Sequence, residues 1–147
     1  MNPELILTKC DCHSKDDLLS QLVDHMYNAA LEFPIPKNDL IEAVQKREQI
    51  GATMFPSGLS VPHTRLLGFE GFIFALATPR EPIFHEGIKL RLMALLISSQ
   101  TGGPYYLPTV AALTKISKDR EYLSRLTEAD SPESFIGIIE EQDVQLG

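Results

Sequence analysis

Lys-Leu-Arg-Leu-Met-Ala-Leu-Leu-Ile-Ser, residues 89–98, is the stretch that decides the fold of this 147-residue chain. Its apolar side chains follow one another with little alternation, and residues 71–77, Gly-Phe-Ile-Phe-Ala-Leu-Ala, show the same pattern. Near-continuous apolar strands are typical of a sheet that is covered on both faces. Both stretches therefore predict buried strands with helices packed on either side.

Helical patterns precede and follow these strands. After a short apolar strand at residues 5–7, Ser14 is an expected helix N-cap, because its hydroxyl can accept from a free backbone amide. Apolar residues then recur at helical spacing as far as Tyr27, and Pro34 and Pro36 end that helix. Further helices are expected to begin at Lys37 or Asn38, at Leu107, at Asp119 and after a Ser131 cap.

The expected order is a strand, two helices, further strands and then three helices. This order predicts an α/β fold, a three-layer α/β/α sandwich with a small mixed sheet and helices on both faces. The length suits a single domain over residues 1–147. Residues 51–64 show no periodicity and are expected to form a loop, residues 101–104 a turn, and Leu107 and Ala111 are expected to face inward.

The composition argues against two classes of partner. The net charge is −7 and no basic patch is evident, so a nucleic-acid backbone would be repelled. The best apolar run contains Arg91 and is far shorter than the roughly 20 residues of a membrane span. The first residues lack the basic and apolar regions of a signal peptide, so we expect a cytoplasmic location without membrane insertion.

The two cysteines are one residue apart, at Cys10 and Cys12, where a disulfide would be strained. With Asp11 and His13 they resemble part of a metal site. A structural zinc site would normally have a second, separated ligand pair, and none is evident. We therefore expect no metal, and two small residues at a strand end followed by a turn.

His63 is the candidate reactive group. Pro62 stiffens the backbone immediately before it, and Arg65, two residues on, projects to the same side in an extended segment. A neutral imidazole can attack phosphorus, and a guanidinium group can bind the phosphoryl oxygens. The ordinary alternative is a surface histidine with a surface arginine beside it.

Residues 47–63, Arg-Glu-Gln-Ile-Gly-Ala-Thr-Met-Phe-Pro-Ser-Gly-Leu-Ser-Val-Pro-His, resemble a known signature. It is that of the enzyme IIA domains of fructose–mannitol and nitrogen-regulatory type, which belong to the bacterial phosphoenolpyruvate-dependent sugar phosphotransferase system. The signature opens with Arg-Glu, has a threonine near its middle and closes with Pro-His. Its spacing matches here without a gap, and the weaker resemblance beyond it covers nearly the whole chain.

The resemblance implies a phosphorylated His63 with Arg47 beside it, where its guanidinium offsets phosphoryl charge. Arg65 is a further candidate contact to the phosphate or to a partner. Arg47 could instead be a solvated helix end, and Arg65 a surface charge. Many members carry a second histidine where this chain has Tyr106, which can donate a hydrogen bond to phosphate but cannot become cationic. Tyr106 could also simply pack, and His85 could approach the site from a turn.

The resemblance also implies the function and the partners. A IIA-type carrier accepts phosphate from the phosphohistidine of the small histidine phosphocarrier protein. It passes the phosphate to a cysteine of a IIB component, or serves as a phosphorylation-state regulator of a target protein. No cofactor is expected. The rival is a non-catalytic regulatory module that keeps the IIA fold, while a hydrolase lacks an evident set of nucleophile, base and orienting group.

Overall fold

The computed structural model describes residues 2–29, 31–51, 54–100 and 104–141. The strands are β1 (Ile6–Cys10), β2 (Leu59–Ser60), β3 (His63–Leu66), β4 (Phe72–Pro79), β5 (Ile83–His85), β6 (Ile88–Leu90) and β7 (Leu92–Ser99). The helices are α1 (Lys15–Asn28), α2 (Lys37–Ile50), α3 (Tyr106–Lys118), α4 (Arg120–Glu128) and α5 (Pro132–Glu141), with a 3-10 turn, η1, at Pro3–Leu5. The predicted element order is confirmed.

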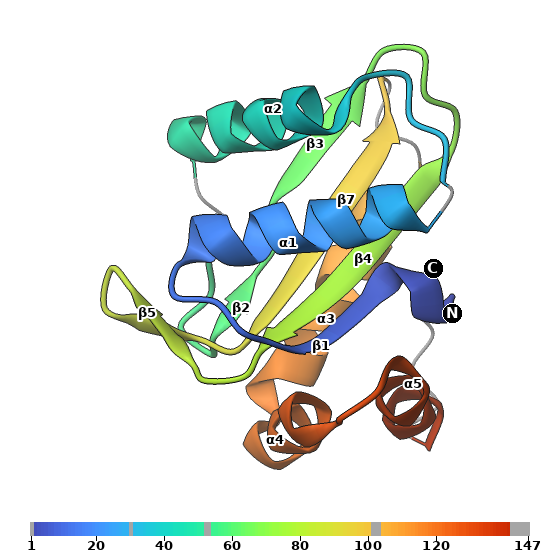
Figure 1. The fold of residues 1–147 in the computed structure, drawn as a ribbon. Coiled ribbons are helices and arrows are strands. Elements are labelled where there is room, and N and C mark those ends of the chain that lie inside the picture. Colours follow the sequence, from blue (N-terminus) through green and yellow to red (C-terminus); the bar gives the residue numbers. More distant parts are fainter. Residues whose placement is uncertain (1, 30, 52–53, 101–103, 142–147) are drawn as a thin grey trace.

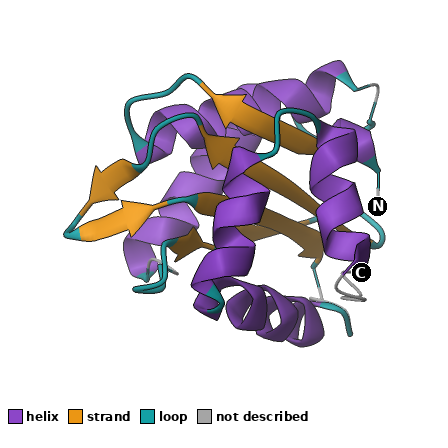
Figure 2. Cartoon of the chain, turned by 90° about the horizontal axis from the view of Figure 1, so that it is seen from below, coloured by secondary structure: helices purple, strands orange, loops and turns teal. Residues whose placement is uncertain are grey.

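The main sheet is mixed, with strand order β1-β4-β7 and both β2 and β3 paired to the far edge of β7 (Figure 1). β1 is parallel to β4, β4 is antiparallel to β7, and β2 and β3 are parallel to β7. Helices lie on both sides of the strands, as the view from below shows (Figure 2). The three-layer α/β/α sandwich predicted from the apolar strands is therefore confirmed.

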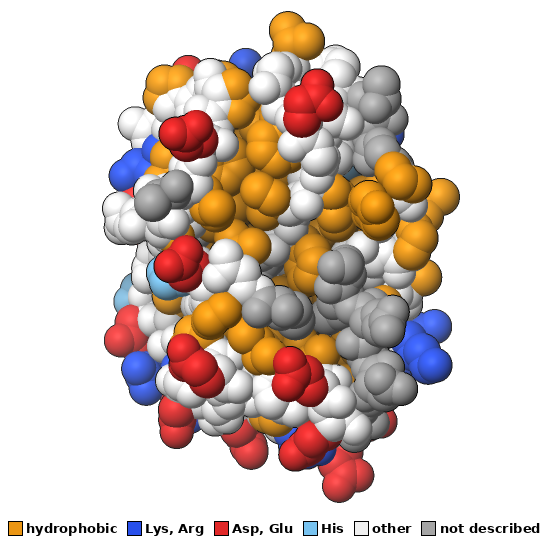
Figure 3. All heavy atoms as spheres, turned by 90° about the vertical axis from the view of Figure 1, so that its right-hand side faces the viewer, with side chains coloured by type: hydrophobic (Ala, Val, Ile, Leu, Met, Phe, Trp, Pro, Cys, Tyr) orange, Lys and Arg blue, Asp and Glu red, His pale blue; other side chains and the backbone are white. Residues whose placement is uncertain are grey.

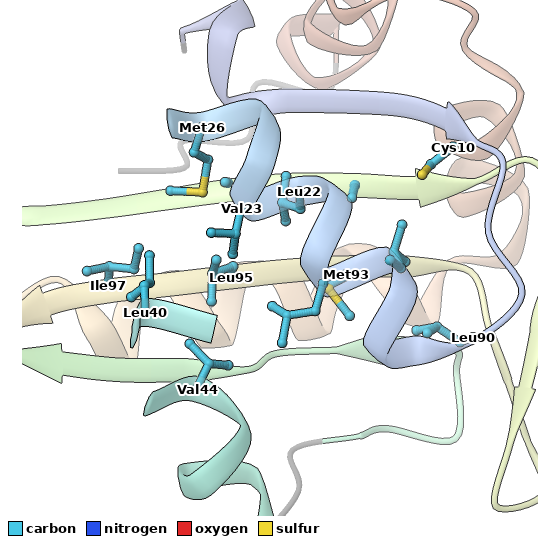
Figure 4. Close-up of a cluster of buried hydrophobic side chains, with 14 of the residues drawn as sticks. Cys10, Leu22, Val23, Met26, Leu40, Val44, Leu90, Met93, Leu95 and Ile97 are labelled. Carbon is cyan, nitrogen blue, oxygen red and sulfur yellow. The ribbon is translucent and has the colours of Figure 1, made fainter. Parts of the chain in front are cut away.

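The alternation of side chains along β7 divides the core in two. Met93, Leu95 and Ile97 belong to the core under α1 and α2 (Figure 4). Leu92, Ala94 and Leu96 belong to the core under α3, α4 and α5. Successive residues of a strand point to opposite faces, so a strand buried on both sides must be apolar throughout.

The helix starts follow from the capping residues. Ser14 Oγ accepts from the Asp17 amide at 3.0 Å, as predicted, and Asp119 accepts from the Tyr122 amide at 3.1 Å. Ser131 Oγ accepts from the Ser134 amide at 3.1 Å. Each side chain satisfies one of the amides that the first helical turn leaves without a backbone partner.

Three details of the prediction were wrong. Residues 51–64 are not all loop, because β2 and the start of β3 fall within them. The strand expected over residues 89–98 is broken at Arg91, and its first residues pair with β5 in a separate hairpin. Leu107 and Ala111 are exposed, because the buried face of α3 is formed by other residues, Thr109, Leu113, Ile116 and Ser117. Of the turn predicted at residues 101–104, only Pro104 lies within the described residues.

The loops that follow α1 and β3 meet at one end of the molecule. Tyr27 stacks on Phe33 with ring centroids 4.9 Å apart, and Phe33 stacks on Phe69 at 6.0 Å. Seen from that side, apolar side chains gather in the middle of the surface with carboxylates around them (Figure 3). The aromatic stack closes the core under α1 at this end.

Candidate functional site

The strand β3 presents His63 on the surface. Leu66 packs in the core under α1 and α2, and Thr64 is buried. His63 and Arg65 alternate with these two residues and therefore lie on the opposite face of the strand. His63 is half-buried and Arg65 is exposed, so the shared side predicted from the Pro62-His63-Thr64-Arg65 spacing is confirmed.

A glycine turn and a proline direct the chain into this strand. Gly58 has φ +101°, and a Cβ at its position would lie 2.6 Å from the backbone oxygen of Lys89. Only glycine fits such a site, because its left-handed backbone and its close neighbour both exclude a side chain. Pro62 then accepts from the Leu96 amide at 2.9 Å, and His63 pairs with Leu96 in the sheet. These contacts fix the start of β3 against the central strand β7.

The site is an open pocket of about 450 Å³ lined by Arg47, His63, Thr64 and Arg65. Arg47 lies in the last turn of α2, so its guanidinium comes from a different element than the histidine. The structure thus brings together the histidine and both arginines that the sequence singled out. A cavity of this size leaves room for a phosphoryl group between imidazole and guanidinium.

The surroundings of His63 lower its pKa. Burial disfavours the charged ring first, and the positive charges of Arg47 and Arg65 add to this effect. A hydrogen bond with the Val61 backbone and the negative charge of Glu48 oppose it only in part. The imidazole is therefore neutral near pH 7, which is the form that has a free lone pair for attack on phosphorus.

Tyr106 is the first residue of α3 and lies against His63. Its hydroxyl oxygen is 3.5 Å from Nδ1 of His63, and the two ring centroids are 5.0 Å apart at an interplanar angle of 51°. A separation of 3.5 Å is at the long limit for a hydrogen bond. The sequence located this residue correctly beside the histidine, and the contact is with the ring itself.

A largely buried ion pair next to the site was not predicted from the sequence. Lys15 Nζ lies 2.5 Å from a carboxylate oxygen of Glu48, and the two side chains are only 10% and 12% exposed. The pair joins the first turn of α1 to the last turns of α2, beside Arg47. A lysine followed by two aspartates at a helix start reads as a solvated charge, so no signal in the sequence indicated its burial.

The remaining histidines lie away from the pocket around His63. His85 lines a separate cleft of about 460 Å³ together with Lys15, Glu48 and Pro62. His13 is exposed, and His25 on α1 is half-buried. From the sequence, His85 could have approached the site around His63. In the structure it lines the neighbouring cleft instead.

Cys10 and Cys12 are free thiols at the end of β1 and just beyond it. Burial raises the pKa of both thiols, that of Cys12 to about 12. Cys10 Sγ lies 2.8 Å from the side-chain oxygen of Gln21. Protonated thiols are poor metal ligands, and within residues 2–141, apart from the undescribed gaps, no group of three or more His, Cys, Asp or Glu is placed to hold a metal ion.

The described helices are all too short or too polar to cross a membrane. In fold, the chain is similar to IIA mannitol from Escherichia coli, with a TM-score of 0.73 and 15% identity over 95% of this chain and 98% of that one. It is also similar to the nitrogen regulatory protein IIA-Ntr from Neisseria meningitidis, with a TM-score of 0.72 and 20% identity over 94% of both chains.

Residues 1–142 match the family described as "Phosphoenolpyruvate-dependent sugar phosphotransferase system, EIIA 2", and the chain belongs to that family. It is 28% identical over 145 residues to a nitrogen regulatory protein of Escherichia coli, covering 95% of this chain and 86% of that protein. It is 28% identical over 134 residues to the 2-O-alpha-mannosyl-D-glycerate-specific EIIABC component of Escherichia coli. That match covers 88% of this chain but spans only a fifth (20%) of the longer protein.

Proposed function

We propose that His63 accepts a phosphoryl group from the phosphohistidine of the histidine phosphocarrier protein. The phosphoryl group is then passed to a cysteine of a IIB component, or its presence is signalled to a regulatory target protein. Membership of the EIIA family supports a phosphoryl carrier or regulator in general. The observation that carries the specific proposal is that His63, whose pKa is lowered, lines one open pocket together with Arg47 and Arg65.

The proposed reaction is an in-line exchange of one phosphorus–nitrogen bond for another. A lone pair of His63 forms a bond to phosphorus while the bond to the donor imidazole breaks, and the donor leaves as a neutral ring. Because Nδ1 faces the Tyr106 hydroxyl, we assign the attack to Nε2, with the ring proton held on Nδ1. Arg47 and Arg65 supply positive charge to the equatorial oxygens, which is where charge stabilisation accelerates phosphoryl transfer.

Tyr106 has two parts in this proposal. Its hydroxyl oxygen lies 3.5 Å from Nδ1 and its ring packs against the imidazole, which limits the orientation of the imidazole. Its O–H can donate to a phosphoryl oxygen. It brings no positive charge, so the phosphorylated state depends on Arg47 and Arg65 for its electrostatic stabilisation. We expect no resident cofactor in this exchange, because positioning and charge are sufficient for it.

Exposed apolar side chains near the site offer a docking surface for the partners. Ile50 at the end of α2 is 83% exposed, and Tyr105 and Leu107 at the start of α3 are 57% and 75% exposed. The same two helix ends supply Arg47 and Tyr106. Among the structures of similar fold is a complex of enzyme IIA and phosphorylated enzyme IIB for mannitol from Escherichia coli, at 13% identity. We place the exchange in the cytoplasm, where phosphoenolpyruvate is made.

The rival proposal is a regulatory module whose histidine is not phosphorylated. The tyrosine at position 106, where many members have a second histidine, favours it, since Tyr106 gives no charge to the phosphoryl group. Under this proposal the IIA surface binds a target protein, and the relatives described as nitrogen regulatory proteins would be its model.

The test is incubation with phosphoenolpyruvate, enzyme I and the histidine phosphocarrier protein, followed by assay for an acid-labile phosphoryl group. We expect label in the wild type and in the matched variant His13→Ala, because His13 is exposed and away from the site. Loss of label in His63→Ala with an unchanged circular dichroism spectrum supports the carrier. A wild type without label contradicts it and favours the rival.

A further inference from the structure

A second charged cavity, of about 200 Å³, lies at the other end of the strands from the aromatic stack. Lys9, Arg80 and Arg91 line it, together with Thr127 and Glu128 of α4. Arg91 directly precedes Leu92, the first residue of β7, whereas His63 pairs with Leu96 farther along that strand. The cavity is therefore distinct from the pocket around His63 and shares none of its lining residues.

Three cations from three segments converge on this cavity, in a chain whose net charge is −7. Lys9 belongs to β1, Arg80 follows β4, and Arg91 lies between β6 and β7. Glu128 is the one carboxylate of the lining. Asp130 and Asp11 pair with Lys9 and Arg80 but lie outside the lining, so the lining itself carries three cations and one carboxylate. Like charges are held together most readily where an anion offsets them.

The carboxylate partners of two of these cations lie in solvent. Lys9 Nζ is 2.5 Å from Asp130, and Arg80 Nε is 2.7 Å from Asp11, but the two aspartate side chains are 83% and 82% exposed. Exposed ion pairs contribute little, because water competes for both charges. Arg91 donates to Ser124 Oγ at 3.0 Å and makes no ion pair within the described part of the chain. Arg91 thus remains open to a ligand, and a bound anion can share Lys9 and Arg80 with their exposed aspartates or displace these aspartates.

The backbone holds two of the cations in place. Lys9 has φ +48°, in the left-handed region, and its amide donates to Thr78 Oγ1 at 3.0 Å. The register of β1 on β4 shifts at this point, and such a bulge turns a side chain out of the regular alternation. The stem of Arg91 runs over Gly58, within 3.2 Å of where a Cβ would be, and the Arg91 amide donates to the Gly58 oxygen at 2.8 Å.

We propose that this cavity binds a small dianion, a phosphate group or a short dicarboxylate, between Lys9, Arg80 and Arg91. Guanidinium groups bind such oxygens through paired hydrogen bonds, and the ammonium group adds a point charge. At about 30 Å³ per water, the volume holds six or seven waters, which is enough for phosphate or succinate. Walls formed by Pro79 and Pro82 give the cavity a stiff shape.

The test is a titration of the full chain, labelled with ¹⁵N, with inorganic phosphate and separately with succinate at constant ionic strength. We expect saturable shifts of the Arg80, Arg91 and Thr127 amides, with a Kd on the order of 1 mM. Shifts with phosphate alone indicate a tetrahedral dianion, and shifts with succinate alone a dicarboxylate. Shifts of amides near His63 would indicate binding in the pocket around His63, so they do not count as evidence for this cavity.

Substitutions decide whether the three cations form the site. Arg91→Gln and Arg80→Gln should each weaken binding at least about ten-fold, or roughly 1.4 kcal/mol, with the remaining spectrum unchanged. Arg120→Gln is the matched control, because Arg120 is exposed on α4, lies outside the cavity lining and loses the same charge. Absence of saturable shifts at these amides with both ligands overturns the proposal. So does equal weakening by Arg120→Gln, or unchanged binding in both cavity variants.

Discussion

Replacing Arg47 by glutamine should slow phosphorylation of His63 and move its pH dependence. The guanidinium of Arg47 lines the pocket with His63 and is half-buried, so its charge is incompletely screened by water. A charge-assisted hydrogen bond to a phosphoryl oxygen contributes about 1.5–3 kcal/mol, which corresponds to a rate loss of roughly 10- to 150-fold. The lower half of this range is expected, because Arg65 remains in the pocket.

The direction of the pH effect follows from the same charge. Arg47 is the largest charge that lowers the pKa of His63, so its removal raises that pKa toward the ordinary value of about 6.5. In the proposed transfer the neutral ring is the nucleophile, so activity should be lost as the pH falls through the pKa of His63. The acid limb of the rate profile therefore lies below about pH 6.5 in the wild type and moves upward in Arg47→Gln.

The assay is the initial rate of phosphoryl transfer from the phosphorylated histidine carrier, measured between about pH 5 and pH 8. Lys46→Gln is the matched control, because Lys46 is the preceding residue, loses the same charge and has a side chain that is 71% exposed. An acid limb that stays in place in Arg47→Gln, or that moves as far in Lys46→Gln, would refute the electrostatic role. Arg65→Gln should have a smaller effect on the limb, because its influence on the His63 pKa is the weakest of the causes.

Three further substitutions test other parts of the structure. Tyr106→Phe removes the hydroxyl that lies 3.5 Å from Nδ1 of His63, so the transfer rate should fall by about 2- to 10-fold while the melting temperature stays unchanged. A transfer rate equal to that of the wild type would show that the hydroxyl has no part in transfer. Gly58→Ala should lower the free energy of unfolding by about 2 kcal/mol, measured in urea, because its Cβ would lie 2.6 Å from the Lys89 oxygen in a left-handed backbone. A loss no larger than that of Gly71→Ala, at a glycine with φ +103° and nothing within 4 Å, would contradict the role of this close contact. Lys15→Met removes the ammonium group that lies 2.5 Å from the Glu48 carboxylate and should lower the free energy of unfolding by about 3 kcal/mol, measured in urea at pH 7. A loss no larger than that of Lys46→Met, which removes the exposed pair with Glu42, would mean that the burial of the Lys15–Glu48 pair adds nothing to stability.

The layers of the fold were predictable because burial on both faces leaves a continuous mark on a strand. No residue of β7 from Leu92 to Ile97 is polar, and this single feature required helices on both sides. The break at Arg91 was not predictable in the same way. One arginine in an apolar run can extend its charge to the surface, and the strand divides there because its amide turns to the Gly58 oxygen, 33 residues earlier in the chain.

The site was predictable where the local backbone decides the geometry. Pro62 and the extended strand place His63 and Arg65 on one side, and that prediction needed no knowledge of the rest of the chain. Lys15 and Lys9 were not predictable, because their roles depend on residues more than 30 positions away. From the sequence alone, Lys15 beside two aspartates is expected to be solvated. The ion pair with Glu48 follows only from the packing of α1 against α2.

The tyrosine at position 106 bears on how strongly the chain would hold a phosphoryl group. A carrier must accept phosphate and release it, so the phosphorylated state cannot be much more stable than that of the donor or the acceptor. A histidine at position 106 could add a positive charge beside phosphohistidine, whereas a phenol contributes only a neutral hydrogen bond. We therefore expect the wild type, once phosphorylated on His63, to transfer its phosphoryl group more readily than a Tyr106→His variant does. In that variant, hydrolysis and exchange of the phosphoryl group should be slower below about pH 6.5, because the new histidine is charged there. The measurement is the half-life of the labelled protein with and without an acceptor at pH 6 and pH 8. A half-life in Tyr106→His that equals that of the wild type at both pH values would mean that charge at this position does not set the stability of the phosphorylated state.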